Sequence, residues 1–240
     1  MNSKELIKDI SDFCNANFNE NNIFRFSRYF KGGFKGYGVP TELFNKKVHQ
    51  IQKTPAFDLR MLYEIAPSLL GTGMYEEGSF AIMLLKGFKK QFSKDVFHEV
   101  RKWFQYGIDN WAHADTLGMF ILPDFLLKGI VEPVDFQPWI ASGYKFQRRV
   151  VPVTFIKWLK AHKEMPFTPL FALITPLMRD PEREVHQGTG WFLREAWKIR
   201  PEETEDFLMK WKDQSPRLIF QYACEKMNRE GKERFRRRKK

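Results

Sequence analysis

An aromatic residue and a carboxylate stand four positions apart in the segment WFQYGIDNWAHAD, where Trp111 precedes Asp115. On a helix this spacing places both side chains on one face, so that they project together. A carboxylate in such a place can stabilise a developing positive charge or orient an attacking water molecule. The same spacing also occurs where a packed aromatic residue lies beside a solvated carboxylate. Taken alone, the pair is compatible with both interpretations.

An arginine pair, Arg148 and Arg149, directly precedes an apolar run over residues 150–155, and Lys157 follows within two turns. The guanidinium group suits phosphate because its planar fork donates two parallel hydrogen bonds. Arginines that enter a buried helix can instead cap the end of a neighbouring helix. These residues alone support either role equally.

Two glycines, Gly188 and Gly190, interrupt the helical pattern of DPEREVHQGTGWFLREAWKIRP just before Trp191. Each glycine inside a helix costs roughly 1 kcal/mol relative to alanine. They are easier to explain if another backbone, or a ligand, approaches this helix closely. Trp191 by itself is equally compatible with a place in the core.

Several common catalytic and cofactor-binding patterns are absent from the sequence. The five histidines lack paired-ligand spacing and have no cysteine nearby, so we expect no metal. There is no phosphate loop of the GxxxxGK[ST] type and no GxSxG motif. The glycines at 32, 33, 36 and 38 lack the strand and helix of a dinucleotide fingerprint. We therefore expect no cofactor, and we interpret these glycines as a turn that lets aromatic side chains pack closely.

The elements that must position these residues are helical, because apolar residues recur with helical periodicity almost everywhere. Helix pairs are predicted to begin near residues 57, 94, 134, 169 and 202, with spacings of 37, 40, 35 and 33 residues. Proline punctuates these pairs by ending one helix or opening the next. A period of this length is typical of α-solenoids built from HEAT-like antiparallel helix pairs, whose concave face suits a duplex. The alternative is a compact, irregular helical bundle.

Composition narrows the class of protein. Of the 240 residues, 43% are hydrophobic and 16% are aromatic, which excludes disorder and provides a sizeable core. The two cysteines, Cys14 and Cys224, cannot form a disulfide framework and fit a reducing compartment. No apolar run approaches the ~20 residues that span a bilayer, and the amphipathic N-terminus is no signal peptide. We expect a soluble intracellular protein.

Positive charge is concentrated at the C-terminal end of the chain. The formal net charge is +11, of which residues 226–240 carry +7 and residues 1–225 carry +4. Such a basic end favours an anionic partner. We expect a single domain over residues 1–229 and a flexible basic tail over residues 230–240.

Four motifs in this order resemble those of the AlkD-type DNA alkylation repair glycosylases, which are bacterial HEAT-like-repeat proteins that excise alkylated purines. The resemblance covers about residues 5–228, and its last motif is the most specific. The similar residues are Tyr29 with Lys31 and Gly38–Val39–Pro40, then Trp111 with Asp115, then Gln147–Arg148, and finally Gly190–Trp191 with Leu193, Arg194 and Glu195. The chain departs from the family at Ala112, where many members carry an acidic residue.

The resemblance implies a monofunctional DNA glycosylase that acts on positively charged alkylated purines in duplex DNA. Asp115 would stabilise the positive charge that develops at C1′ of the sugar and orient the attacking water. Tyr29, Trp111 and Trp191 would form an aromatic cleft around the lesion's deoxyribose. Arg148 would bind a phosphate beside the lesion, assisted by further cations. These are Lys31, Arg149, Lys157 and Arg194.

The same resemblance implies a monomer in the bacterial cytoplasm that needs neither a metal nor a membrane. Two other classes stay open at this stage. One is a HEAT-like protein that binds DNA structures without catalysis, and the other is a helical scaffold that binds proteins.

Overall fold

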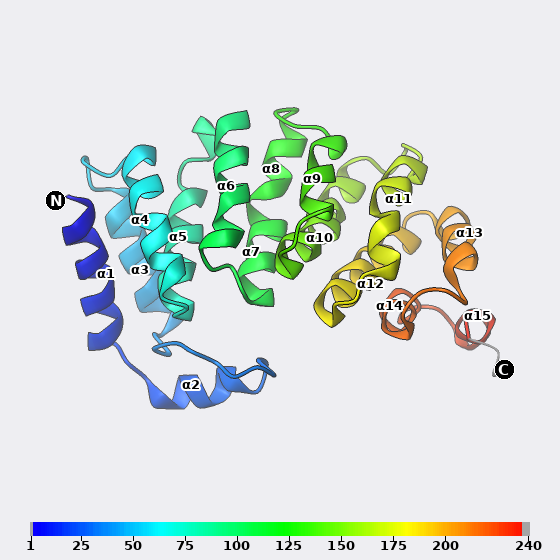
Figure 1. Cartoon of the computed structure of the whole chain (residues 1–240), viewed down its shortest axis with the longest axis horizontal. Coiled ribbons are helices and arrows are strands. Elements are labelled where there is room, and N and C mark those ends of the chain that lie inside the picture. The colour runs from blue at the N-terminus through cyan, green and yellow to red at the C-terminus, as the bar shows by residue number, and fades with distance from the viewer. Residues whose placement is uncertain (1, 237–240) are drawn as a thin grey trace. The chain divides into compact units, whose positions relative to one another are not determined.

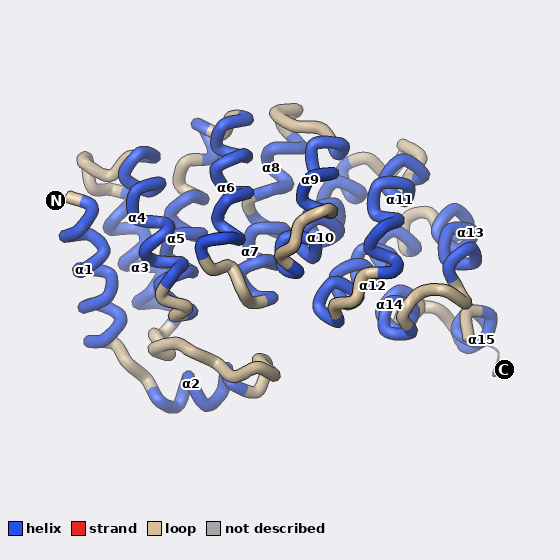
Figure 2. The backbone as a smooth tube through the Cα atoms, viewed as in Figure 1, coloured by secondary structure: helices blue, strands red, loops and turns tan. Residues whose placement is uncertain are grey.

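The structure, a computed structural model, describes residues 2–236 and consists of helices and connecting loops (Figures 1 and 2). No strand occurs in this described part, as the helical periodicity predicts. The chain divides into two compact units, one up to Asp109 and one from Asn110. The prediction of one domain over residues 1–229 does not locate this division, because helical periodicity continues on both sides of it.

The first unit is built from antiparallel helices around α4 and α5, whose apolar faces fill its core. Asp58 caps the start of α4 by accepting a hydrogen bond from the Met61 amide. A Cβ at Gly107 would lie 2.3 Å from the Leu70 carbonyl oxygen, so α6 can end against α4 only with glycine there. The helices of this unit are α1 (Ser3–Ala16), α2 (Glu20–Ser27), α3 (Thr41–Gln52), α4 (Leu59–Gly71), α5 (Tyr75–Lys86), η1 (Lys89–Gln91) and α6 (Lys94–Tyr106).

The glycine-rich segment between α2 and α3 is a turn around a buried carboxylate. Glu76, in the first turn of α5, accepts hydrogen bonds of 2.8–3.2 Å from the backbone amides of residues 37–39. A Cβ at Gly36 would lie 2.6 Å from Glu76 Oε2 and 2.7 Å from the Phe34 ring. The segment is therefore a structural turn, as interpreted from the sequence. Its Phe34 ring packs against those of Phe26, Phe30 and Tyr75.

The second unit is built around α10, the long helix that carries both arginines of the QRR motif. A Cβ at Gly118 of α7 would lie 2.9 Å from Val153, and one at Gly188 of α12 would lie 3.1 Å from Arg149. These glycines let α7 and α12 approach α10 from either side. The helices are α7 (Trp111–Phe120), α8 (Leu122–Leu127), η2 (Pro133–Phe136), α9 (Gln137–Ile140), α10 (Lys145–Ala161), α11 (Thr168–Ile174), η3 (Thr175–Arg179), α12 (Arg183–Trp197), α13 (Pro201–Trp211), α14 (Arg217–Ala223) and α15 (Arg229–Arg234).

Glycine also explains how α12 packs against α14. A Cβ at Gly190 would lie 2.7 Å from the carbonyl oxygen of Ile219 and 2.6 Å from the Tyr222 side chain. The two glycines of α12 therefore face two different neighbouring helices. This confirms the sequence expectation that another backbone approaches α12 closely.

The predicted starts of the helix pairs agree with the observed helices. Near the five predicted positions, α4 begins at Leu59, α6 at Lys94, η2 at Pro133, α11 at Thr168 and α13 at Pro201. Prolines occupy the first or second position of several of these elements, where their missing N–H has no partner to lose. The all-helical repeat architecture is thus confirmed.

The predicted flexible tail from residue 230 differs from the structure in its first part. Residues 229–234 form α15, and the side chain of Phe235 is fully buried against the Phe220 ring. Arg217 donates a 2.7 Å hydrogen bond to the Phe235 carbonyl. An apolar residue among the basic ones anchors this segment to α14, and charge counting overlooked it. The rest of the predicted tail, residues 237–240, lies outside the described residues.

Candidate functional site

Helix α7 begins with an aromatic residue, Trp111, and carries a carboxylate, Asp115, one turn later. The Asn110 side chain caps α7 by accepting a 2.9 Å hydrogen bond from the His113 amide. Capping makes Trp111 the first residue of the helix, and its indole is exposed. Asp115 follows one turn later on the same face. The sequence prediction that these two side chains project together agrees with this arrangement.

Asp115 is held by Arg149 of α10 through two hydrogen bonds. Arg149 Nε donates to Asp115 Oδ1 at 2.9 Å, and Nη2 donates to Oδ2 at 2.7 Å. Its remaining nitrogen, Nη1, donates to the Glu184 carbonyl of α12 at 2.6 Å. One guanidinium therefore joins three helices and fixes the orientation of the Asp115 carboxylate. The side chain of Arg149 is 7% exposed and that of Asp115 is 15% exposed.

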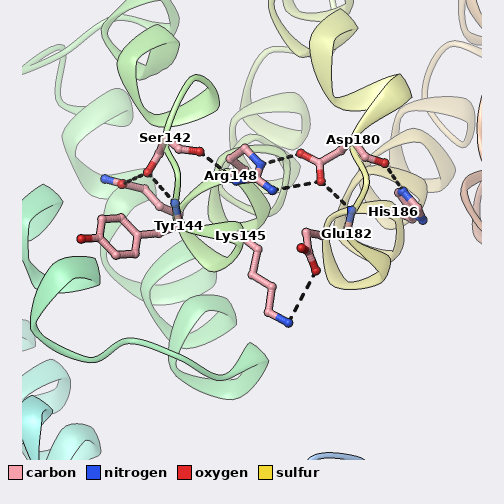
Figure 3. Close-up of polar contacts among 8 residues, drawn as sticks. Ser142, Tyr144, Lys145, Arg148, Asp180, Glu182 and His186 are labelled. Atoms are coloured by element: carbon pink, nitrogen blue, oxygen red, sulfur yellow. Dashed lines mark hydrogen bonds and ion pairs between the residues drawn. The ribbon is translucent and has the colours of Figure 1, made fainter.

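The neighbouring Arg148 forms a second pair of the same kind with Asp180 (Figure 3). Its Nε and Nη2 donate to the two Asp180 oxygens at 2.5 and 3.1 Å, and Nη1 donates to the Ser142 carbonyl at 2.8 Å. Asp180 Oδ1 also accepts a 2.9 Å hydrogen bond from the Glu182 amide. Its backbone carbonyl lies 2.5 Å from His186 Nε2. Asp180 thus organises the loop that leads into α12.

The phosphate-binding role predicted for Arg148 and Arg149 would compete with these contacts. All three nitrogens of each guanidinium are engaged with protein acceptors, and both side chains are largely buried. Arginine forks fit carboxylates as well as phosphates, so the sequence could not distinguish the two. Sequence reasoning missed Asp180 as a partner. Its position before Pro181 gives no indication of a partner 32 residues away.

Two further polar residues lie at the start of α10, beside the arginine pair. The Tyr144 side chain is exposed, and Lys145 Nζ lies 3.7 Å from Glu182 Oε2 (Figure 3). The same Nζ lies 3.3 Å from Glu184 Oε1. Both residues directly precede the arginine pair, and the run YKFQRR was the signal that could have indicated them.

The signature GWFLRE lies on α12, where its charged residues form ion pairs. Arg194 pairs with Glu195 at 3.2 Å and also with Glu225. Burial disfavours the charge of Glu195, but the hydrogen bond and charge of Lys198, followed by those of Arg194, outweigh it and lower the pKa of the Glu195 carboxyl. Trp191 is partly buried on this helix. The predicted DNA contact of Arg194 would compete with its carboxylate partners.

Three further predicted residues lie on α10 and in the segment after α2. Lys157 of α10 places its Nζ 5.0 Å from the centroid of the exposed Phe120 ring. Tyr29 and Lys31 belong to the first unit, where both are exposed just after α2. The structure therefore assembles Trp111, Asp115 and Arg149 within the second unit.

Two further kinds of site have no counterpart among the described residues. Within residues 2–236, no group of three or more His, Cys, Asp or Glu side chains is placed to hold a metal ion. None of the described helices is both long and apolar enough to cross a membrane.

The structure thus combines a helical-repeat fold with a carboxylate, Asp115, that Arg149 holds one turn from the exposed Trp111. The profile of the family described as DNA alkylation repair enzyme matches residues 14–227. The chain belongs to this family, which confirms the resemblance found in the sequence. No curated protein matches the chain.

Solved structures show the same fold at low sequence identity. One is a predicted DNA alkylation repair enzyme from Enterococcus faecalis, with 17% identity, a TM-score of 0.72, and coverage of 88% of this chain and 97% of that one. Another is AlkD2 from Streptococcus mutans, with 17% identity, a TM-score of 0.59, and coverage of 87% and 99%.

Proposed function

We propose that the protein is a DNA glycosylase that hydrolyses the N-glycosidic bond of positively charged alkylated purines in duplex DNA. Lesions of the 3-methyladenine and 7-methylguanine type are the expected substrates. The observation that carries the proposal is the Asp115 carboxylate, which Arg149 holds one turn below the exposed Trp111. Membership of the DNA alkylation repair enzyme family supports it.

The chemistry needs a fixed negative charge more than it needs an acid. An N3- or N7-alkylated purine carries a formal positive charge and leaves readily without protonation. The sugar then develops positive charge at C1′, which a preorganised carboxylate stabilises. Asp115 is the proposed carboxylate, and it would also orient the attacking water.

Arg149 acts in this proposal as a positioning residue. Its two hydrogen bonds prevent Asp115 from rotating, so the carboxylate is oriented before substrate arrives and loses little conformational freedom in the transition state. Trp111, together with Tyr29 and Trp191, would pack against the lesion's deoxyribose and exclude water. The proposed phosphate contacts fall to Lys31, Lys157 and Arg194.

The proposed reaction ends at an abasic site. In the sequence, no lysine has the setting of a nucleophile, so hydrolysis should not be followed by strand cleavage. The protein would act as a monomer on double-stranded DNA.

A second function is favoured by one feature of the same pair. Both Asp115 oxygens already accept hydrogen bonds from Arg149, which is also the arrangement of a purely structural ion pair. In that case the protein would bind DNA without breaking the glycosidic bond. A protein-binding scaffold is the third class, and its association with duplex DNA would lack a steep salt dependence.

Incubation with duplex DNA methylated at purine nitrogens tests the proposal. Chromatography should detect free 7-methylguanine or 3-methyladenine, and the strand should break only after alkaline treatment of the abasic site. Base release should fall roughly 1,000-fold in Asp115→Asn while duplex binding persists. Binding of the duplex by the wild-type protein with no free base would contradict the proposal and favour the non-catalytic function.

A further inference from the structure

Helix α2 of the first unit has no buried residue, although it carries two phenylalanines. Figure 1 shows α2 set apart from the bundle formed by α1, α3, α4 and α5, and the loop after α2 returns to the start of α5. The side chain of Phe24 is 63% exposed. A single exposed aromatic ring is common on protein surfaces, so the side chains around Phe24 decide whether it belongs to a binding surface.

The helix is nevertheless held firmly from one side. Phe26 lies on the face opposite Phe24, and its ring packs 5.6 Å from that of Phe34. The loop that carries Phe34 is fixed in turn by the hydrogen bonds from its backbone amides to the buried Glu76. The exposed face of α2 is therefore presented on an anchored element.

This exposed face combines aromatic and basic side chains. We name it the α2 surface and define it by Phe24, Arg25, Arg28, Tyr29 and Lys31, all of which are exposed. Over residues 18–36 four basic side chains stand against the single acidic Glu20, a formal net charge of +3. A polyanion with planar apolar groups complements such a surface in both charge and shape.

Phe24 and Arg28 form a pair suited to stacking. They lie one turn apart, and the Arg28 guanidinium carbon is 4.8 Å from the centroid of the Phe24 ring. Nucleobases that have left the helical stack pack on aromatic rings and on guanidinium planes alike. The neighbouring cations suit the phosphates that flank such a base.

We propose that the α2 surface binds DNA by stacking an unpaired base on Phe24 and Arg28, while Arg25 and Lys31 contact the flanking phosphates. The inference rests on DNA being the substrate in the proposed function. It adds a base-binding pair, Phe24 and Arg28, which the proposed function does not use, whereas Tyr29 and Lys31 of the same surface also belong to the proposed glycosylase site. DNA from which a purine is being removed offers such a base on the strand opposite the lesion.

Binding of two fluorescently labelled duplexes tests the proposal, one fully paired and one with a single unpaired thymine. Phe24→Ala should weaken binding of the second duplex roughly tenfold, as expected for loss of one base–aromatic stack, and should affect the paired duplex less. Phe24→Trp should retain the preference. Arg28→Gln should weaken both duplexes and reduce their salt dependence.

Phe18→Ala is the matched control. Phe18 is 59% exposed, but it lies before α2 between two asparagines and has no basic neighbour in sequence. This variant should bind both duplexes as the wild type does. Equal effects of the two alanine variants, or an equal loss by Phe24→Ala on both duplexes, would overturn the proposal. So would capture of the wild type, but not of Phe24→Ala, by phosphatidylserine vesicles with DNA binding unchanged.

Base release from methylated DNA separates this proposal from the proposed function. A Phe24-dependent preference for the unpaired base without any base release would remove the glycosylase function and leave the stacking platform standing. Base release by a Phe24→Ala variant that also binds both duplexes normally would do the reverse. Failure of the wild type to bind either duplex would overturn both.

Discussion

Two adjacent arginines of α10 each hold one aspartate by two hydrogen bonds, yet the surroundings of the two aspartates differ. Asp180 also accepts a hydrogen bond from the Glu182 amide, and its side chain is 5% exposed. Asp115 lies inside a helix, one turn from an exposed tryptophan, and its side chain is 15% exposed. The first carboxylate organises a loop, whereas the second is fixed at the edge of a surface.

The difference teaches that pair geometry alone does not identify a functional arginine or aspartate. Both pairs satisfy the planar match between guanidinium and carboxylate. The two pairs differ in how far the carboxylate is exposed to solvent. Only a carboxylate that reaches the surface can approach a sugar, so Asp115 and not Asp180 is the proposed catalytic group.

Removal of the two arginines should produce the largest effects and separate the pairs. Arg149→Ala leaves the Asp115 charge without its partner, so we expect stability to fall by about 3 kcal/mol. Base release should fall roughly 100-fold, because the carboxylate loses its fixed orientation. Urea unfolding and single-turnover base release measure the two effects.

Arg148→Ala is the matched variant. It should cost similar stability, because Asp180 is at least as buried, but base release should change less than tenfold if binding is saturated. Equal losses of base release in the two variants would show that the pairs are not functionally distinct.

Replacing either arginine with lysine should affect base release less than replacing it with alanine does, and it tests whether the geometry of the arginine matters. Lys keeps the charge but cannot donate two parallel hydrogen bonds. Arg149→Lys should therefore reduce the single-turnover rate roughly tenfold, while Arg148→Lys should leave the rate close to wild type. A normal rate in Arg149→Lys would mean that the charge of this residue suffices and its geometry does not matter.

Gly188→Ala should disturb one pair and spare the other. The new Cβ would lie 3.1 Å from Arg149 Cγ and 3.2 Å from the Arg149 carbonyl oxygen. Alanine gains about 1 kcal/mol of helix propensity, which offsets much of this strain, so stability should change little. Base release should fall several-fold as Arg149 shifts. Unchanged release would show that the position of Arg149 tolerates small displacements.

A third ion-pair cluster, around Glu195 of α12, should show the smallest effect. The pKa of the Glu195 carboxyl is lowered in the folded protein, so its ion pairs stabilise the fold at pH values above the ordinary pKa of 4.5. This stabilisation is lost as the pH falls through the lowered pKa. Glu195→Gln should cost about 1 kcal/mol at neutral pH and nothing at low pH. Unfolding curves over this range measure it, and a cost independent of pH would contradict the assignment.

The sequence predicted the helical repeat well because helical periodicity and proline positions are local signals. The starts of α6 and α11, for example, lie within one residue of their predicted positions. The glycines of α12 were also interpretable, because an unfavourable residue inside a helix indicates a close neighbour. The same local signals do not report where a chain divides into compact units, so they give no indication of the division after Asp109.

The site was predicted only in part, because partners distant in sequence decide the roles of charged residues. Trp111 and Asp115 are four residues apart, and helix geometry alone relates them. Arg148 and Asp180 are separated by 32 residues, and no spacing rule connects them. Because their partners could not be identified from the sequence, Arg148 and Arg149 were predicted to bind phosphates. Likewise, the concentration of basic residues predicted a flexible tail, and the sequence alone did not indicate that Phe235 within it is buried.

The most direct test of the central claim compares Asp115→Asn with Asp180→Asn in single-turnover base release from methylated duplex DNA. Both substitutions remove one charge from a matched arginine–aspartate pair, and thermal unfolding reports how far each weakens the fold. We predict that Asp115→Asn lowers the rate roughly 1,000-fold while the folded protein still binds the duplex, since the lost group stabilises charge in the transition state. Asp180→Asn should release base at nearly the wild-type rate at temperatures where it is folded. Near-wild-type release by folded Asp115→Asn, or an equal loss in both variants, would contradict the claim that Asp115 is the catalytic carboxylate.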